Sequence, residues 1–167
     1  MTDTRHDRAA QNKVWDMIKS IKVATMVTLD GAGRLRGRPM WAQQESFEST
    51  LWFFAKDGSP VVEEIGAEPR VLLSYAEPAS QDYVSLFGKA RAFKDLAKQK
   101  SLWSEGMRVW FPEGPEDPSL VVIAVEVEGA EYWDAPSSKV LHAWGYVKAV
   151  TTGEPPQGGE NAKVSFT

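Results

Sequence analysis

Short runs of β-branched and aromatic residues, each followed by a turn signal, restrict the fold of this sequence more than any other feature. In the run 120–128, Val121, Ile123 and Val125 alternate with their neighbours and therefore share one face of a strand. The segment Asp30-Gly31-Ala32-Gly33 predicts a tight hairpin, and Gly88 predicts a bulge or a close backbone approach. About six or seven strands are expected, over 22–30, 35–43, 50–55, 70–76, 82–93, 120–128 and 130–134.

Helical patterns flank and connect these strands. Apolar residues recur every three or four positions near the N-terminus, which predicts an amphipathic helix. Ser59 and Pro60 suit the cap and first turn of a short helix. The expected helices span 5–20, 60–65, 95–105 and a segment from a cap at Ser137 or Ser138 to Gly153, and 109–119 is expected to be a loop. This pattern predicts an α+β fold built on an antiparallel barrel.

The composition fits one domain without metals or disulfides. The chain has 167 residues, of which 43% are apolar, and its net charge of −4 argues against a nucleic-acid partner. The absence of cysteine excludes disulfides, thiolate catalysis and cysteine zinc sites. The polar N-terminus and the lack of a long apolar run predict a cytoplasmic protein with no membrane partner. We expect a single domain over 1–167, with loosely held tails at 1–8 and 154–167.

The sequence gives little support for the common catalytic motifs. The glycine-rich segment 31–37 lies between two predicted strands and has the wrong spacing for a dinucleotide fingerprint. The two histidines are His6 and His142, so a histidine metal site or a catalytic triad would depend on His142 alone. Neighbouring carboxylates such as Glu63 and Glu64 are typical of a solvated surface. No motif here indicates a hydrolase.

A group of cations beside a predicted helix start is the remaining candidate site. Arg36 and Arg38 share one strand face, and Lys56 lies just before Ser59 and Pro60. Backbone amides at a helix N-terminus together with a nearby arginine can form a phosphate site. Two solvent-facing arginines on an edge strand would explain the same pattern equally well.

Several short segments follow one another in a distinctive order. They are Arg38-Pro39-Met40, Leu51-Trp52-Phe53-Phe54-Ala55, Asp57-Gly58-Ser59-Pro60, Val71-Leu72-Leu73-Ser74-Tyr75, Gly88-Lys89-Ala90, Trp110-Phe111-Pro112 and Glu131-Tyr132-Trp133-Asp134. In this order and spacing they resemble the general-stress-protein subgroup of the pyridoxamine-phosphate-oxidase-like flavoproteins. The resemblance extends over residues 14–164, which is nearly the whole chain.

The resemblance implies a split β-barrel that forms a homodimer and binds FMN in clefts between the two subunits. The cofactor-binding residues that it implies are Arg38, Pro39, Met40, Phe54, Ala55, Lys56, Ser59, Pro60, Lys89, Trp110 and Trp133. Among them, Lys56 and Ser59 would hold the phosphate. For the donor beside N1 and the C2 carbonyl of the ring we propose Arg38 and Lys89, because a fixed positive charge there favours reduction. Trp133 would approach the ring, from the second subunit in one arrangement.

Two positions depart from the family pattern. Val61 stands where a lysine usually follows the Ser-Pro of the short helix, and Phe87 stands where a serine usually precedes the glycine of the fifth strand. Both changes remove polar groups near the expected cofactor. Because charge-assisted hydrogen bonds are the strong ones, we expect weakened phosphate binding and partial FMN occupancy.

Two functional classes remain open. The first is an oxidoreductase that moves hydride or electrons through FMN between small-molecule donors and acceptors. The second is a flavin-binding stress protein without turnover, which acts as a buffer or sensor, and the lack of an evident general acid or base favours it. Pyridoxal phosphate, haem or a deazaflavin are further alternatives in the same fold, although haem would need His142 as its axial ligand.

Overall fold

The computed structural model describes residues 4–5, 8–134 and 159–167. Its sheet contains eight strands, which are β1 (Thr4–Arg5), β2 (Val23–Leu29), β3 (Leu35–Trp41), β4 (Thr50–Lys56), β5 (Arg70–Glu77), β6 (Asp82–Phe93), β7 (Leu120–Asp134) and β8 (Glu160–Ser165). The helices are α1 (Arg8–Ile21), α2 (Pro60–Ala67) and α3 (Leu96–Leu102), and two short 3-10 helices, η1 (Glu105–Val109) and η2 (Gly114–Glu116), follow α3. The helix expected between 137 and 153 lies outside the described residues.

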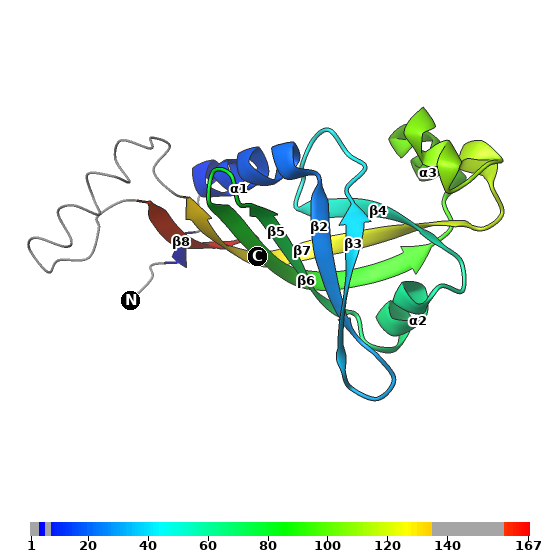
Figure 1. Cartoon of the computed structure of the whole chain (residues 1–167), viewed down its shortest axis with the longest axis horizontal. Coiled ribbons are helices and arrows are strands. Elements are labelled where there is room, and N and C mark those ends of the chain that lie inside the picture. Colours follow the sequence, from blue (N-terminus) through cyan, green and yellow to red (C-terminus); the bar gives the residue numbers. More distant parts are fainter. Residues whose placement is uncertain (1–3, 6–7, 135–158) are drawn as a thin grey trace, which may run out of the picture.

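Strand β7 organises the sheet, whose order is β1-β8-β7-β6-β5-β2-β3 with β4 paired to β7. One edge of β7 pairs with β6, while the other edge pairs with β4 in its first half and with β8 in its second half. Among the described strands, β1 and β8 are the one parallel pair, and all other pairs are antiparallel. Between β3 and β4 a single bridge joins Ala42 to Phe53, so no continuous ladder closes the barrel in the described part of the chain. The predicted α+β split barrel is confirmed (Figure 1).

The first hairpin forms as the sequence predicts. Strands β2 and β3 pair from Val23 with Trp41 to Leu29 with Leu35. In the turn, the Asp30 carboxylate accepts hydrogen bonds from the backbone amides of Ala32 and Arg34, and Gly33 adopts a positive φ of 74°. These bonds and this φ fix the two-strand register, because only a residue without a Cβ adopts that φ at little cost.

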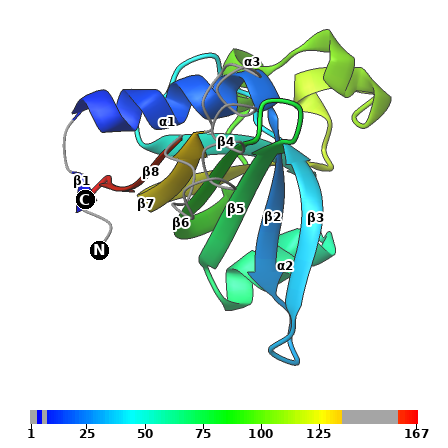
Figure 2. The ribbon, with the colours of Figure 1, turned by 60° about the vertical axis from the view of Figure 1, so that its left-hand side comes forward.

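The core lies inside the strands, and helices cover its two ends. Helix α1 buries Val14 and Ile18 against the barrel and contacts β5, β6 and β8. Helix α2 lies at the opposite end and contacts β2, β4 and β6 (Figures 1 and 2). Both helices have one apolar stripe, as their sequence periodicity predicts. Among the described residues, no helix combines the length and apolarity that crossing a bilayer requires.

Gly88 confirms the expected irregularity in β6. The pairing of β6 with β7 changes register between Phe87 and Gly88. A Cβ atom on Gly88 would lie 2.0 Å from the backbone oxygen of Glu126. The two backbones therefore approach too closely for any side chain at this position.

The expected loose tail over 154–167 is wrong for its last part. Residues Glu160–Ser165 form β8, which pairs with the second half of β7 and buries Ala162 and Val164. The alternation of two small apolar residues is too short to signal a strand by itself, but the free edge of β7 supplies a pairing partner. Near the other end, Thr4–Arg5 pair with β8 instead of starting the first helix, which begins at Arg8.

The segment between β6 and β7 is also more ordered than its sequence suggests. The helix expected over 95–105 ends at Leu102, and the expected loop at 109–119 contains η2. Asp95 caps α3 by accepting a hydrogen bond from the Lys98 amide. Phe111 is buried here against Phe54 in a second apolar cluster. This cluster fixes η1 beside β4 and so shapes the site described next.

Candidate functional site

A cavity of about 500 Å³ lies between the ends of β2, β3 and β4, the start of α2 and the segment around η1. It is lined by Val23, Pro39, Met40, Trp41, Gln43, Phe54, Ala55, Lys56, Ser59, Val61, Met107, Trp110 and Phe111. Of the residues predicted to bind a cofactor, Pro39, Met40, Phe54, Ala55, Lys56, Ser59 and Trp110 come together here. The volume falls within the range of about 300–1,000 Å³ that is usual for small-molecule sites.

One end of the cavity is polar. Ser59 is the N-cap of α2, but its hydroxyl makes no capping bond, and its Oγ is buried without any hydrogen-bond partner among the described residues. A buried hydroxyl without a partner is costly, so this atom is suited to a ligand. Lys56 lies at the end of β4, and its carbonyl accepts a hydrogen bond of 3.1 Å from the Ser59 amide.

The charge of Lys56 acts on one nearby carboxylate. The pKa of Asp117 is lowered, mainly because the Ser119 hydroxyl and amide donate hydrogen bonds to it, with a smaller contribution from the positive charge of Lys56. No described acidic side chain lies within ion-pair distance of the Lys56 ammonium. Its charge therefore remains available for an anionic group in the cavity.

The other walls are apolar and flat. Phe54 of β4 packs edge-to-face on Phe111 with the ring centroids 6.3 Å apart, and both rings reach the cavity. This side also includes Met107 on η1 and Trp110, the residue directly after η1. The Trp110 side chain is exposed. Such a wall suits a planar aromatic ring.

An ion pair between Glu105 and Arg108 lies within η1 itself. Arg108 donates to Glu105 from Nε at 2.7 Å, and the indole N–H of Trp103 donates to the same carboxylate at 3.0 Å. These donors lower the pKa of Glu105 to about 2. The charged form of Glu105 therefore stabilises the segment that carries Met107 and Trp110.

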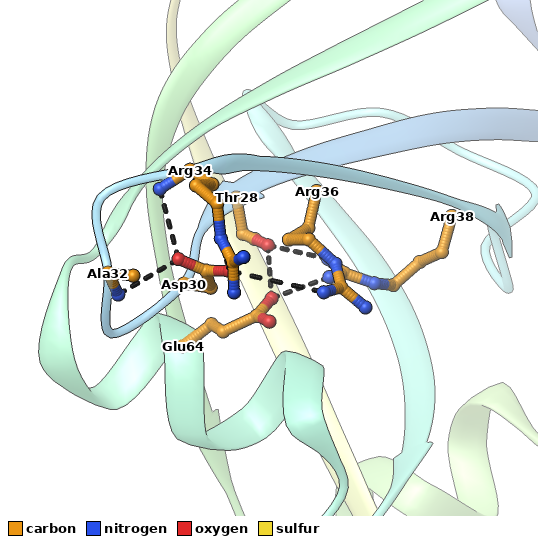
Figure 3. Close-up of polar contacts among 7 residues, drawn as sticks. All are labelled: Thr28, Asp30, Ala32, Arg34, Arg36, Arg38 and Glu64. Carbon is orange, nitrogen blue, oxygen red and sulfur yellow. Dashed lines mark hydrogen bonds and ion pairs between the residues drawn. The ribbon is translucent and has the colours of Figure 1, made fainter.

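Arg38 lies outside the lining and is bound by the protein itself (Figure 3). Its guanidinium donates to the Thr28 hydroxyl at 2.6 Å and to Glu64 Oε2 at 2.5 Å, and Thr28 donates to the same Glu64 oxygen. The side chains of Arg38 and Glu64 are 21% and 10% exposed. The predicted contact of Arg38 with a flavin ring stays a prediction. In the single chain, Arg38 already shares its charge with Glu64.

The remaining predicted residues also lie outside the lining. Pro60 occupies the first turn of α2, next to Ser59. Lys89 on β6 forms an ion pair of 3.5 Å with Glu128, and Trp133 lies half-exposed on β7. Within one chain, Lys89 and Trp133 do not reach this cavity. Their predicted roles are therefore not tested by the single chain.

Sequence reasoning missed part of the lining. Val23, Gln43 and Met107 carry no chemical signal of their own, and Trp41 was not among the predicted cofactor-binding residues. Phe111 lies in the Trp110-Phe111-Pro112 segment and could have been found there. Val61 belongs to the core and also lines the cavity, so an apolar side chain stands where the family usually has a lysine.

Comparisons with known proteins support the family resemblance. The model of the family described as "Pyridoxamine 5'-phosphate oxidase like" matches residues 9–157. General stress protein 26 of Bacillus subtilis (strain 168) is 28% identical over 130 residues, which is 75% of this chain and 89% of that protein.

Solved structures have the same architecture. The general stress FMN/FAD binding protein of Xanthomonas citri is 27% identical, with a TM-score of 0.69 over 79% of this chain and 93% of that one. A general stress protein 26 structure from Jannaschia sp. CCS1, 21% identical, gives a TM-score of 0.78 over 96% of this chain and 100% of that one, and so supports the fold. Taken together with the matched residues 9–157, these findings establish that the chain belongs to the pyridoxamine 5'-phosphate oxidase-like family.

Proposed function

We propose that this protein binds FMN in the 500 Å³ cavity, with the phosphate at the Lys56 and Ser59 end. The observation that carries the proposal is the buried Ser59 Oγ, which has no hydrogen-bond partner among the described residues. A phosphate oxygen would accept its hydrogen bond, and the Lys56 ammonium would neutralise part of the dianion. The FMN/FAD binding named for the Xanthomonas citri structure agrees with this assignment.

The apolar walls suit the other half of the cofactor. Pro39, Met40, Phe54 and Trp110 would contact the isoalloxazine and exclude water from it. A bound flavin supplies reversible hydride and one-electron chemistry. The residues of this chain would orient the ring and shield it, and the described residues of the lining include no histidine and no carboxylate that could act as a general acid or base.

The proposal includes a homodimer. On the outer face of the sheet, Val27 pairs with Leu72 and Leu72 pairs with Phe87, which forms an apolar row across three strands. The Phe87 side chain is 51% exposed, and its ring lies over Gly129. Exposed apolar rows of this kind favour burial against a partner. A second copy would also allow Trp133 or Lys89 to reach the cofactor of its neighbour.

Within this proposal we favour an FMN-dependent oxidoreductase that acts on small molecules in a stress response. A flavin-binding protein without turnover is the alternative, and the lack of acid–base side chains among the described lining residues favours it. The cytoplasmic location expected from the sequence is part of the same proposal.

The experiment is flavin uptake followed by reduction. The purified protein is titrated with FMN and with riboflavin, which lacks the phosphate, while the flavin absorbance is recorded. We expect tighter binding of FMN than of riboflavin. Anaerobic addition of a reduced nicotinamide then separates the two classes, since bleaching supports the oxidoreductase and retained colour supports the binding protein. A protein that takes up neither flavin at saturating concentration would refute the proposal.

A further inference from the structure

A second cavity, of about 330 Å³, lies at the other side of Trp41 and Gln43, which line both cavities. It is formed by the end of α1, the residues that follow β3, and the side chain of Tyr75 on β5. Its volume is at the lower end of the range of about 300–1,000 Å³ that is usual for ligand sites. Nothing in the proposed flavin site uses it.

The floor of this cavity holds an unsatisfied donor. Tyr75 is 1% exposed, and its hydroxyl has no hydrogen-bond partner among the described residues. Burial raises the pKa of Tyr75, so the group stays protonated and can donate. An acceptor atom of a molecule bound in this cavity would satisfy this donor.

Two lysines and one glutamate line the mouth of the cavity. Lys19 and Lys22 line it, and Lys19 is paired with Asp16. Lys22 makes no ion pair with any side chain in the described part of the chain. Glu45, which is exposed, is the one acidic residue among the described lining residues. An ammonium and a phenol hydroxyl on two residues that line one cavity favour an anion with two acceptor oxygens.

Two indole rings give the cavity its shape. Trp15 is held by a stacked contact with Phe47, with the ring centroids 5.7 Å apart and the planes at 13°. Trp41 lines the cavity as well and is largely exposed. Flat aromatic walls favour flat ligands.

We propose that this cavity is a binding site for a small planar carboxylate. Its ring would lie against Trp15 and Trp41, and its carboxylate would accept hydrogen bonds from Tyr75 and Lys22. The site stands on the cavity and its donors, and it does not depend on flavin binding. Because Trp41 and Gln43 belong to both cavities, the bound carboxylate would lie next to the flavin site without entering it.

The test is calorimetric titration of the whole protein with benzoate, before and after saturation with FMN. Benzamide, which is planar and neutral, and cyclohexanecarboxylate, which is anionic and not planar, are the comparison ligands. We expect one benzoate per chain, weaker binding of both comparison ligands, and unchanged benzoate binding in the presence of FMN. No benzoate binding, or its displacement by FMN, would overturn the proposal.

Two variants test the donors. We expect Tyr75→Phe to weaken benzoate binding by roughly tenfold, since it removes one buried hydrogen bond. Lys22→Gln should weaken benzoate and leave benzamide unchanged. The matched controls Tyr83→Phe and Lys100→Gln, on exposed residues outside this cavity, should behave as the parent protein does. Unchanged benzoate affinity in both Tyr75→Phe and Lys22→Gln would contradict the assignment. If Tyr75→Phe fails to fold, unchanged benzoate affinity in Lys22→Gln alone would contradict it.

Discussion

Arg38 and Glu64 form an ion pair of 2.5 Å between β3 and α2, and the Thr28 hydroxyl bonds to both partners. The pair links the first hairpin to the helix whose N-cap, Ser59, borders the cavity. A largely buried carboxylate with these donors is costly to leave unpaired. The pair therefore couples the position of α2 to that of β3.

Replacing one partner of this pair should lower the stability of the fold. We expect Arg38→Ala to reduce the free energy of unfolding by about 2–3 kcal/mol, because the charge of Glu64 stays buried without its partner, while the partial exposure of Arg38 moderates the loss. Glu64→Gln should cost about 1 kcal/mol, since the amide can still accept the Thr28 hydrogen bond. Urea unfolding measures both. Equal stability of Arg38→Ala and the parent protein would show that the pair contributes nothing.

The exposed pair of Glu68 and Arg70 provides the control. Its side chains are bonded at 2.8 Å, and they are more exposed than those of Arg38 and Glu64, at 72% for Arg70 and 29% for Glu68. Solvent and salt screen such a pair, so Glu68→Gln should change the unfolding midpoint little. A loss as large as that of Arg38→Ala would contradict the importance assigned to burial.

Lys56 should discriminate flavins by their phosphate. We expect Lys56→Gln to weaken FMN binding about tenfold, because one charge-assisted contact is lost, and to leave riboflavin binding unchanged. Flavin fluorescence quenching measures both affinities. Lys94→Gln serves as the matched control, since this lysine is paired with Asp57 and does not line the cavity. An equal loss for both flavins in Lys56→Gln would show that this residue does not hold the phosphate.

Gly88 and Gly66 should respond in opposite directions to the same substitution. Gly88→Ala places a methyl group against the Glu126 carbonyl oxygen, so we expect a loss of about 3 kcal/mol or more. Gly66 lies in α2, and no heavy atom lies within 4 Å of the place that a Cβ would take there, so Gly66→Ala should gain roughly 0.4–1 kcal/mol. Thermal unfolding followed by circular dichroism measures both. A tolerated Gly88→Ala would refute the close approach.

Acid should loosen the segment around η1. The pKa of Glu105 is lowered from 4.5 to about 2 by Arg108 and the Trp103 indole. The folded pKa is below the unfolded value, so this contribution is complete above about pH 4.5 and is lost as the pH falls toward 2. We expect a change in Trp103 fluorescence within this window, measured as the difference between the parent protein and Trp103→Phe. When both proteins also carry Glu105→Gln, the difference between them should not vary with pH over the same range.

Phe87 should control self-association. Because Phe87→Glu places a charge in the exposed apolar row, it should shift the protein from dimer to monomer in size-exclusion chromatography with light scattering. Leu96→Glu on α3 is the control, since Leu96 is also exposed and lies outside that row. A parent protein that is already monomeric, or a Phe87→Glu dimer, would contradict the proposed interface.

Much of the local structure could be predicted from the amino-acid sequence. Three features follow from the backbone preferences of particular residue types. They are the hairpin at 30–33, the start of α2 at Ser59-Pro60 and the bulge at Gly88. The apolar alternation of β7 and the helical stripe of α1 are local patterns of the same kind. The family resemblance added the cavity residues near Pro39, Phe54 and Ser59.

Contacts between groups that are distant along the chain could not be predicted in this way and are seen only in the fold. Arg38 and Glu64 are 26 residues apart, and no local pattern shows that the carboxylate binds this arginine. The pairing of β8 with β7 and the unpartnered Tyr75 hydroxyl likewise depend on which segments fold against each other. Periodicity reports what each residue does within its own strand or helix, whereas ion pairs, edges and cavities arise from contacts between elements that the chain brings together only on folding.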